Sequence, residues 1–217
     1  MCGVLTRFFY YCFRIYPKAK KIYYKYWNRF FFSLIGIQYG KGLKIYNKVY
    51  IIGKGTIKIG DNFTFLSGDC FNPICRNLRG AIYTMNEKAE IIIRNNVGLS
   101  SACLWAYESI TIGNDVNIGG DCLIMDNDAH PLDFVKRRSV YEKQVGRQNY
   151  MKNILSAPIV VEDDVWLGAR CVILKGVHIG ARSIIAAGSI VTKDIPADCI
   201  AGGNPCRIIR KIRYGNK

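Results

Sequence analysis

The stretch VEDDVWLGARCVILKGVHIGARSIIAAGSIV, residues 161–191, decides the fold. Aliphatic residues recur in it at every sixth position: Val161, Leu167, Ile173, Ile179, Ile185 and Val191. A period of six fits neither the 3.6-residue turn of an α-helix nor the two-residue alternation of a strand, so a short strand and its corner must repeat together. The stretch therefore predicts a solenoid in which these side chains stack from one coil to the next.

Upstream, the same spacing is present but less regular. Ile112, Ile118 and Ile124 keep it, and a looser set is Ile93, Leu99 and Trp105. Before these come Ile45, Ile52, Ile59, Phe65 and Phe71, spaced six or seven apart. Gly or Ala often follows the aliphatic residue, as in Leu167-Gly168, where a small residue lets the backbone turn sharply.

Two segments interrupt the spacing. Residues 72–90 predict a loop or a distorted coil. Residues 133–158 are rich in charged and amide side chains and separate the repeat that ends at Ile124 from the one that begins at Val161. Loops of this length inside a compact fold are usually functional, so the insertion 133–158 is a candidate part of a site.

Four motifs make the chain similar to a known family: VWLG at 165–168, KGVHIG at 175–180, IAAGSIVTKDIP at 185–196 and AGGNPCR at 201–207. Over residues 41–213 the chain resembles the hexapeptide-repeat acyltransferases, and most closely the sugar O-acetyltransferases, such as the galactoside and maltose enzymes. The resemblance implies an all-β fold, a left-handed parallel β-helix over residues 41–200 that carries the insertion. We expect an amphipathic helical segment at 1–40 before it and a short basic helix or tail at 201–217 after it.

The resemblance also implies an activity. It predicts a homotrimer with active sites between neighbouring subunits, acetyl-CoA as acyl donor, and a sugar hydroxyl as acceptor in surface or capsular polysaccharide synthesis. Two alternatives stay open: N-acetylation of an amino sugar or antibiotic, and a non-catalytic β-helix that serves as an assembly subunit. Nucleic-acid binding is not favoured, because no recognition motif accompanies the basic charge.

The candidate general base is His130, in MDNDAHPLD at residues 125–133, where the regular repeat gives way to the insertion. Transfer to an alcohol needs a group that accepts the hydroxyl proton, and imidazole titrates near neutral pH. The DxDxHP-like context matches the position of the family's catalytic histidine. Asp126 and Asp128 flank it; either carboxylate would orient the imidazole or, alternatively, cap the turn into the insertion.

Coenzyme A contacts are carried over from the resemblance. They fall at Ala169, Ala187, Thr192 and Lys193, with Arg207 and Arg210 near the nucleotide phosphates and Trp166 as a wall of the acceptor or thioester pocket. Ala169 replaces a serine typical of the galactoside enzymes, and Ser100 stands where they place a sugar-contacting asparagine. Charge complementarity supports the three basic residues as phosphate ligands. The alternative for them is a solvated surface charge, and for Trp166 it is packing between subunits.

No metal is expected. The chain has two histidines, and we expect His178 to point outward because it lies between an inward position and a corner. The nine cysteines include no CxxC pair, and Cys122 and Cys171 occupy small-residue positions of the repeat. We therefore expect reduced packing thiols in a cytoplasmic protein, and Arg7 and Arg14 interrupt the apolar stretch that a secretory signal would need.

The basic charge is concentrated towards the N-terminus. Residues 1–60 hold twelve Lys or Arg and no acid, whereas residues 61–217 hold nineteen basic and sixteen acidic residues. After Pro17, one face of a predicted helix carries Ile22, Tyr23, Tyr26, Trp27, Phe30 and Phe31, and the opposite face carries Lys18, Lys21, Lys25 and Asn28. The uncharged run 30–40 is about half the roughly 20 residues that a membrane span needs. Two interpretations stay open: a cap on the first coil, or peripheral docking on an anionic membrane surface.

Overall fold

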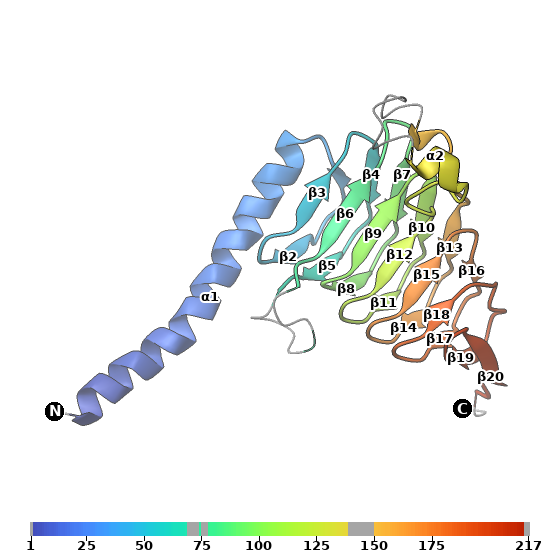
Figure 1. The fold of residues 1–217 in the computed structure, drawn as a ribbon. Coiled ribbons are helices and arrows are strands. Elements are labelled where there is room, and N and C mark those ends of the chain that lie inside the picture. The colour runs from blue at the N-terminus through green and yellow to red at the C-terminus, as the bar shows by residue number, and fades with distance from the viewer. Residues whose placement is uncertain (1, 69–73, 75–77, 139–149, 215–217) are drawn as a thin grey trace.

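The computed structural model describes residues 2–68, 74, 78–138 and 150–214. This part of the chain forms the helices α1 (Cys2–Leu34) and α2 (Phe134–Arg138) and twenty short strands, β1 to β20. The strands stack into one solenoid. The long helix α1 projects from the first coil, and the last strands lie at the opposite end (Figure 1).

The strands form three sheets, one along each side of the solenoid. Sheet A holds β1 (Gln38–Tyr39), β4 (Thr56–Ile59), β7 (Glu90–Ile93), β10 (Ser109–Ile112), β13 (Ile159–Val161) and β16 (His178–Ile179). Sheet B holds β2 (Lys44–Tyr46), β5 (Thr64–Leu66), β8 (Gly98–Ser100), β11 (Asn117–Ile118), β14 (Trp166–Leu167), β17 (Ile184–Ile185), β19 (Cys199–Gly202) and β20 (Arg207–Lys211). Sheet C holds β3 (Tyr50–Ile52), β6 (Ala81–Thr84), β9 (Cys103–Ala106), β12 (Leu123–Met125), β15 (Val172–Leu174) and β18 (Ile190–Val191). Up to β18 the chain visits sheets A, B and C in turn, which confirms the left-handed parallel β-helix.

The interior is a stack of aliphatic side chains, as the six-residue period predicts. All six positions of the defining stretch, Val161 to Val191, are fully buried. In sheet A, Ile112 pairs with Val161 and Val161 pairs with Ile179, so repeat positions lie directly above one another. Full burial of one aliphatic side chain contributes roughly 1.5–3 kcal/mol to the free energy of unfolding. The stacked aliphatic side chains are therefore a large source of the solenoid's stability.

Two upstream positions differ from the expected pattern. In β9 the buried residue is Leu104 and not Trp105, because the coil after Leu99 is one residue shorter than the period. In β3 the side chain that packs against the core is Ile51, whereas Ile52 is 51% exposed. Phe71 lies outside the described residues.

Asn and Asp side chains join successive coils at one corner. Asn62, Asn96 and Asp115 have φ angles of 56°, 59° and 57°, a conformation that Asn and Asp tolerate better than most residues. Asn62 Nδ2 donates to Asn96 Oδ1 at 2.9 Å, and Asn96 Nδ2 donates to Asp115 Oδ1 at 2.9 Å. At a different corner a side chain has no room, because a Cβ on Gly119 would lie 2.6 Å from the backbone nitrogen of Ala169. The small residues of the repeat therefore let the coils stack closely.

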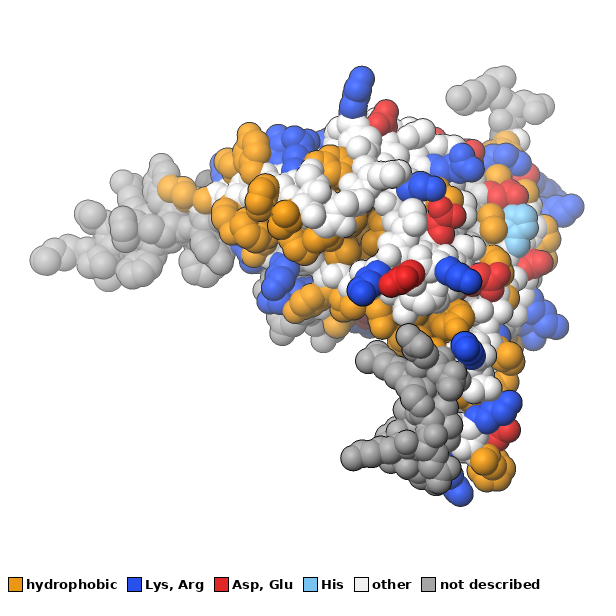
Figure 2. All heavy atoms as spheres, turned by 90° about the horizontal axis from the view of Figure 1, so that it is seen from above, with side chains coloured by type: hydrophobic (Ala, Val, Ile, Leu, Met, Phe, Trp, Pro, Cys, Tyr) orange, Lys and Arg blue, Asp and Glu red, His pale blue; other side chains and the backbone are white. Residues whose placement is uncertain are grey.

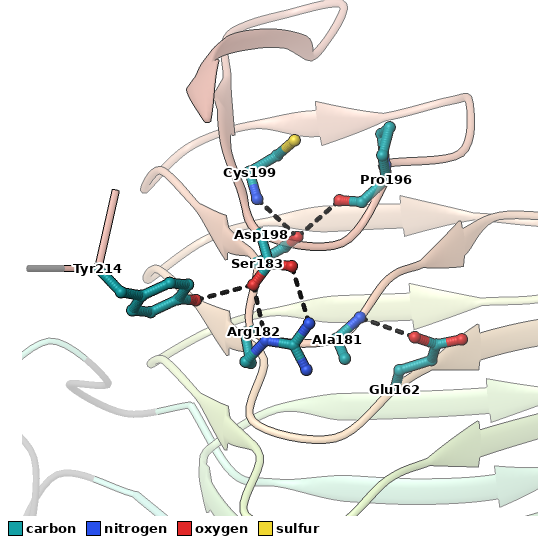
Figure 3. A network of polar contacts seen from close by, with 8 residues as sticks. All are labelled: Glu162, Ala181, Arg182, Ser183, Pro196, Asp198, Cys199 and Tyr214. Atoms are coloured by element: carbon teal, nitrogen blue, oxygen red, sulfur yellow. Dashed lines mark hydrogen bonds and ion pairs between the residues drawn. The ribbon is translucent and has the colours of Figure 1, made fainter. Parts of the chain in front are cut away.

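A network of polar contacts closes the last coils (Figure 3). Arg182 donates from Nε and Nη2 to the two carboxylate oxygens of Asp198, at 2.6 and 2.7 Å, and the Tyr214 hydroxyl donates to the same carboxylate at 3.0 Å. Ser183 Oγ donates to the Pro196 carbonyl at 2.7 Å. These contacts fasten the C-terminal part of the described chain to the solenoid.

Three segments differ from the sequence-based expectation. Residues 81–84, expected within a loop or distorted coil, form the regular strand β6 between β3 and β9. Residues 207–211, expected as a helix or tail, form β20, which pairs antiparallel with β19 and covers the edge of sheet B. Helix α1 begins at Cys2 and not after Pro17, so Pro17 lies within it.

Helix α1 docks on the β-helix through Asn28, Phe31 and Phe32. Asn28 is 3% exposed, and its Nδ2 donates to the carbonyls of Ile45 and Asn47 at 3.1 and 3.0 Å. Phe32, one turn later, is fully buried in the core, and Phe31 packs against that core. Asn28, which the sequence placed with lysines on the polar face of the helix, is therefore buried, and backbone carbonyls of the first coil satisfy its amide.

Within the described ranges, no helix combines the length and the apolarity that crossing a membrane requires.

Candidate functional site

The candidate residues lie at the two ends of the strands of sheet C, in the corners where the chain enters and leaves this sheet. Strands β9, β12, β15 and β18 run parallel and in register, so the residues that follow them form one edge and those that precede them form the other. We call the first the histidine edge (residues 126–130, 175 and 192–193) and the second the alanine edge (residues 100, 169 and 187). Because β15 has three residues, the two edges are roughly 10 Å apart.

His130 is exposed at the histidine edge, shortly after β12. Its Nδ1 lies 2.6 Å from the hydroxyl oxygen of Tyr150, which is only 5% exposed. The two rings meet edge to face, with their centroids 6.2 Å apart. The His130 backbone N–H donates to the Asp128 carbonyl at 2.6 Å and helps to fix the turn. The imidazole is thus held on its Nδ1 side, and nothing in the described part of the chain bonds to Nε2.

Asp126 is fully buried beneath this turn and caps the neighbouring coil. Its Oδ1 accepts the backbone N–H of Tyr107 at 2.6 Å, and its Oδ2 accepts that of Glu108 at 2.7 Å. Burial raises the pKa of the Asp126 carboxyl above its ordinary value, and these hydrogen bonds offset part of that rise. The contacts of this carboxylate therefore fit the capping alternative.

Asp128 is engaged by a residue of the following coil. Its Oδ1 accepts from Lys175 Nζ at 2.6 Å, and its side chain is 18% exposed. Its Oδ2 is buried and has no partner among the residues that the structure describes. Asp126 and Asp128 are thus directed to other groups, and the hydrogen-bond partner of the imidazole is Tyr150.

Small residues predominate at the alanine edge, as in Gly168-Ala169 and Ala186-Ala187-Gly188. Ala187 is exposed and Ala169 is half-buried. The Gly188 N–H donates to the Ala169 carbonyl at 2.8 Å, which aligns these two coils. Ser100 lies further along the edge, where its carbonyl accepts the Asp121 N–H at 3.2 Å. A thin ligand could approach the backbone at Ala169 and Ala187, because their side chains are small.

The structure separates the remaining expected coenzyme A residues. Thr192 and Lys193 are exposed at the histidine edge, beyond His130 along the solenoid. Arg207 and Arg210 are exposed on β20 in sheet B. Each of these arginines donates from Nη1 to the backbone carbonyl of an adjacent residue, at 2.9 and 3.3 Å.

Trp166 lies on the outer face of sheet B, three residues before Ala169. It is 55% exposed. It is therefore near the alanine edge and not the histidine edge.

A groove of about 960 Å³ opens beside the histidine edge. Its walls include Tyr83, Lys54, Met85, Tyr107, Glu108, Met151 and Ser156. The Tyr107 hydroxyl donates to the Met151 carbonyl at 3.0 Å, which ties the end of the insertion to the solenoid. Because Met151 directly follows Tyr150, the wall of the groove is continuous with the residue that holds His130.

The sequence did not identify Tyr150, Lys175 or Tyr107 as site residues. Tyr150 lies in the insertion, 20 positions from His130, where no repeat position marks it. Lys175 lies within a motif that the sequence does show, but it meets Asp128 across 47 positions. That contact becomes predictable only once the register of β12 with β15 is known.

His178 is exposed, as expected, and its Nε2 lies 2.8 Å from Glu162 Oε1. Cys122 and Cys171 are buried free thiols within the stack. Among the residues that the structure describes, no three His, Cys, Asp or Glu side chains are grouped to hold a metal ion.

Comparisons with known proteins agree with this fold. Residues 158–193 match the model of the hexapeptide repeat of succinyl-transferase. The galactoside O-acetyltransferase of Lactococcus lactis is 42% identical over 105 residues, which are 48% of this chain and 44% of the relative. The chain spans about half the length of the curated relatives it matches.

The chain is also similar to solved structures. A hexapeptide-repeat acetyltransferase from Vibrio cholerae, solved with acetyl coenzyme A, is 33% identical over 61% of this chain and 66% of its own, with a TM-score of 0.48. AntD, an N-acyltransferase from Bacillus cereus solved with dTDP and 3-hydroxybutyryl-CoA, has a TM-score of 0.59 at 18% identity, over 85% of this chain and 88% of its own. The likeness to AntD concerns the fold alone.

Proposed function

We propose that this chain, which belongs to the hexapeptide-repeat acetyltransferase family, transfers an acetyl group from acetyl-CoA to a hydroxyl group of a sugar. His130 is the general base of the proposed reaction. The observation that carries the proposal is the 2.6 Å contact between His130 Nδ1 and the buried Tyr150, at the edge of a β-helix and beside a groove. This contact holds the imidazole and leaves Nε2 for the acceptor.

In the proposed mechanism, the His130 Nδ1–H donates to the Tyr150 hydroxyl oxygen, so the lone pair is on Nε2. Nε2 takes the proton of the sugar hydroxyl while its oxygen attacks the thioester carbonyl carbon. The C–S bond then breaks, and the imidazolium returns the proton to the departing thiolate. The products are an acetyl ester and coenzyme A, without an acyl-enzyme. Backbone N–H groups of the neighbouring coil stabilise the developing oxyanion.

Coenzyme A is proposed to lie along the alanine edge and across sheet C. The small side chains of Ala169 and Ala187 leave room for the thin pantetheine arm, and Lys193 supplies positive charge for phosphate. Arg207 and Arg210 are on sheet B of the same chain. A homotrimer, with each cofactor between two subunits, would bring basic residues from both sheets to one ligand.

The groove beside the histidine edge is the proposed acceptor site. Sugar rings present apolar faces that pack on aromatic rings and hydroxyls that bond to polar groups, and Tyr83, Tyr107 and Glu108 offer both. Ser100 lies on the opposite edge and would reach an acceptor only from a neighbouring subunit. A role in surface polysaccharide synthesis rests on the family resemblance and on the galactoside acceptor named for the Lactococcus relative.

A transfer assay tests the proposal. The full-length protein is incubated with acetyl-CoA and matched sugar pairs that differ only in a hydroxyl or an amino group, and thiol release and product mass are followed. We expect ester formation on the hydroxyl sugar. Amide formation alone would identify an N-acetyltransferase, and a lack of both transfer and acetyl-CoA binding by calorimetry would favour an assembly subunit.

A further inference from the structure

The fold leaves a stripe of large apolar side chains on α1 unused. Its members are each between 45% and 70% exposed: Ile22, Tyr23, Tyr26, Trp27, Phe30 and Leu34. Spacings of three and four residues place them on one face of the helix. We call this face the aromatic stripe. A contiguous apolar surface on a folded chain marks an interaction site, because removing it from water is favourable.

The way in which α1 docks keeps the aromatic stripe outward. Asn28 and Phe32, which hold the helix to the first coil, are on the face opposite the stripe. Rotating the helix to bury the stripe would break both Asn28 hydrogen bonds and withdraw Phe32 from the core. Figure 2 shows hydrophobic side chains gathered on the surface where α1 meets the β-helix. A capping role therefore accounts for Asn28 and Phe32 but not for the stripe.

Only positive charges accompany the aromatic stripe. Lys18 and Lys25 are exposed on the same helix, and residues 1–60 contain no acid. The partner that fits is apolar inside and anionic at its surface, as a bilayer with anionic lipids is. A second α1 carries the same positive charge and offers no acid to pair with it. A nucleic acid would pair with the lysines but leave the stripe in water.

We propose that α1 lies in the interface of an anionic lipid bilayer, with the aromatic stripe among the headgroups and the lysines near lipid phosphates. Its 33 residues extend about 50 Å, and much of that length projects beyond the solenoid (Figure 1). The helix can thus lie along a membrane while the β-helix stays in water.

The test is co-sedimentation of the full-length protein with vesicles. Vesicles that mix phosphatidylglycerol with phosphatidylcholine are compared with pure phosphatidylcholine, at low and high salt. We expect binding to the anionic vesicles that weakens as salt rises, because salt screens the attraction to the headgroups. A full-length protein that stays in the supernatant with anionic vesicles at low salt overturns the proposal.

Two variants locate the contact. Phe30→Ser should lower the vesicle partition coefficient roughly tenfold or more, because a buried phenylalanine contributes at least that factor. Phe134→Ser is the matched control, since Phe134 on α2 is 57% exposed and Phe30 is 61% exposed. Equal losses in both variants contradict the assignment to the stripe. Self-association that Phe30→Ser abolishes, without any vesicle binding, would identify a second copy as the occupant and likewise overturn the proposal.

Discussion

The hydroxyl oxygen of Tyr150 lies 2.6 Å from Nδ1 of His130 and is the partner that the structure gives to this imidazole. An isolated neutral imidazole carries its proton on either nitrogen, whereas general-base chemistry at Nε2 requires the proton on Nδ1. In the proposed mechanism the Tyr150 hydroxyl accepts from Nδ1–H and so favours that form. The sequence neighbours Asp126 and Asp128 do not supply this contact, because each carboxylate is bonded elsewhere.

Tyr150→Phe should therefore lower kcat about tenfold, the worth of one hydrogen bond to a group that becomes charged, and leave the KM for acetyl-CoA unchanged. Nitrogen-15 NMR of labelled histidine gives a second readout, because the chain contains only His130 and His178. The His130 tautomer should change in the variant while His178 provides an internal control. An unchanged tautomer and unchanged kcat would remove Tyr150 from the positioning role.

Lys193→Ala should raise the KM for acetyl-CoA with little effect on kcat, because a phosphate contact binds the ground state and the transition state equally. Arg210→Ala should do the same if a trimer brings sheet B to the cofactor. With the acetyl thioester of dephospho-coenzyme A, which lacks one phosphate, the difference in KM between variant and wild type should become smaller. A KM that stays at the wild-type value in both variants would show that these side chains are only solvated surface charges.

Asp126→Ala should destabilise the fold by roughly 1–3 kcal/mol, because the backbone N–H groups of Tyr107 and Glu108 lose their buried acceptor. Urea denaturation measures this loss as a lower midpoint with an unchanged slope. Asp133→Ala serves as a control, because Asp133 is an exposed acid of the same segment whose Oδ1 accepts the backbone N–H of Val135. Equal stability of the two variants would contradict the capping role.

The protein should lose stability in acid. Hydrogen bonds from the Ala181 N–H and from His178 lower the pKa of Glu162, and the Arg182 guanidinium lowers the pKa of Asp198. A carboxyl whose pKa is lower in the folded state stabilises the fold fully above its unfolded pKa and loses that contribution as pH falls through the folded value. The temperature of half-unfolding should therefore decrease as the pH is lowered below about 4.5, which is the ordinary pKa of glutamate. Glu162→Gln should flatten this profile, and an identical profile in the variant would contradict the assignment.

Much of the fold was predictable because the six-residue period sets both the burial and the register. The six aliphatic positions from Val161 to Val191 follow this period without exception, and all six side chains are buried. The prediction failed where a coil departs from the period, as at Leu104 beside Trp105. It also failed at Asn28, since amphipathicity cannot reveal that two backbone carbonyls satisfy a buried amide.

The candidate site was predictable only in part. The sequence pointed to His130 because of its motif, and the repeat register explains why Lys193 shares its edge of sheet C. Tyr150 and the groove were not predictable, because the insertion follows no period and its contacts join residues distant in sequence.

The role of His130 as general base is tested by comparing His130→Ala with His178→Ala in acetyl transfer and in acetyl-CoA binding by calorimetry. We predict that His130→Ala lowers kcat by roughly 10²- to 10⁴-fold, the usual contribution of a general base, and leaves acetyl-CoA affinity unchanged. His178→Ala should keep its activity, because this exposed side chain bonds to Glu162 and not to a residue of the histidine edge. A His130→Ala protein that retains more than about a third of the wild-type kcat would contradict the central claim, since loss of a general base costs far more than threefold.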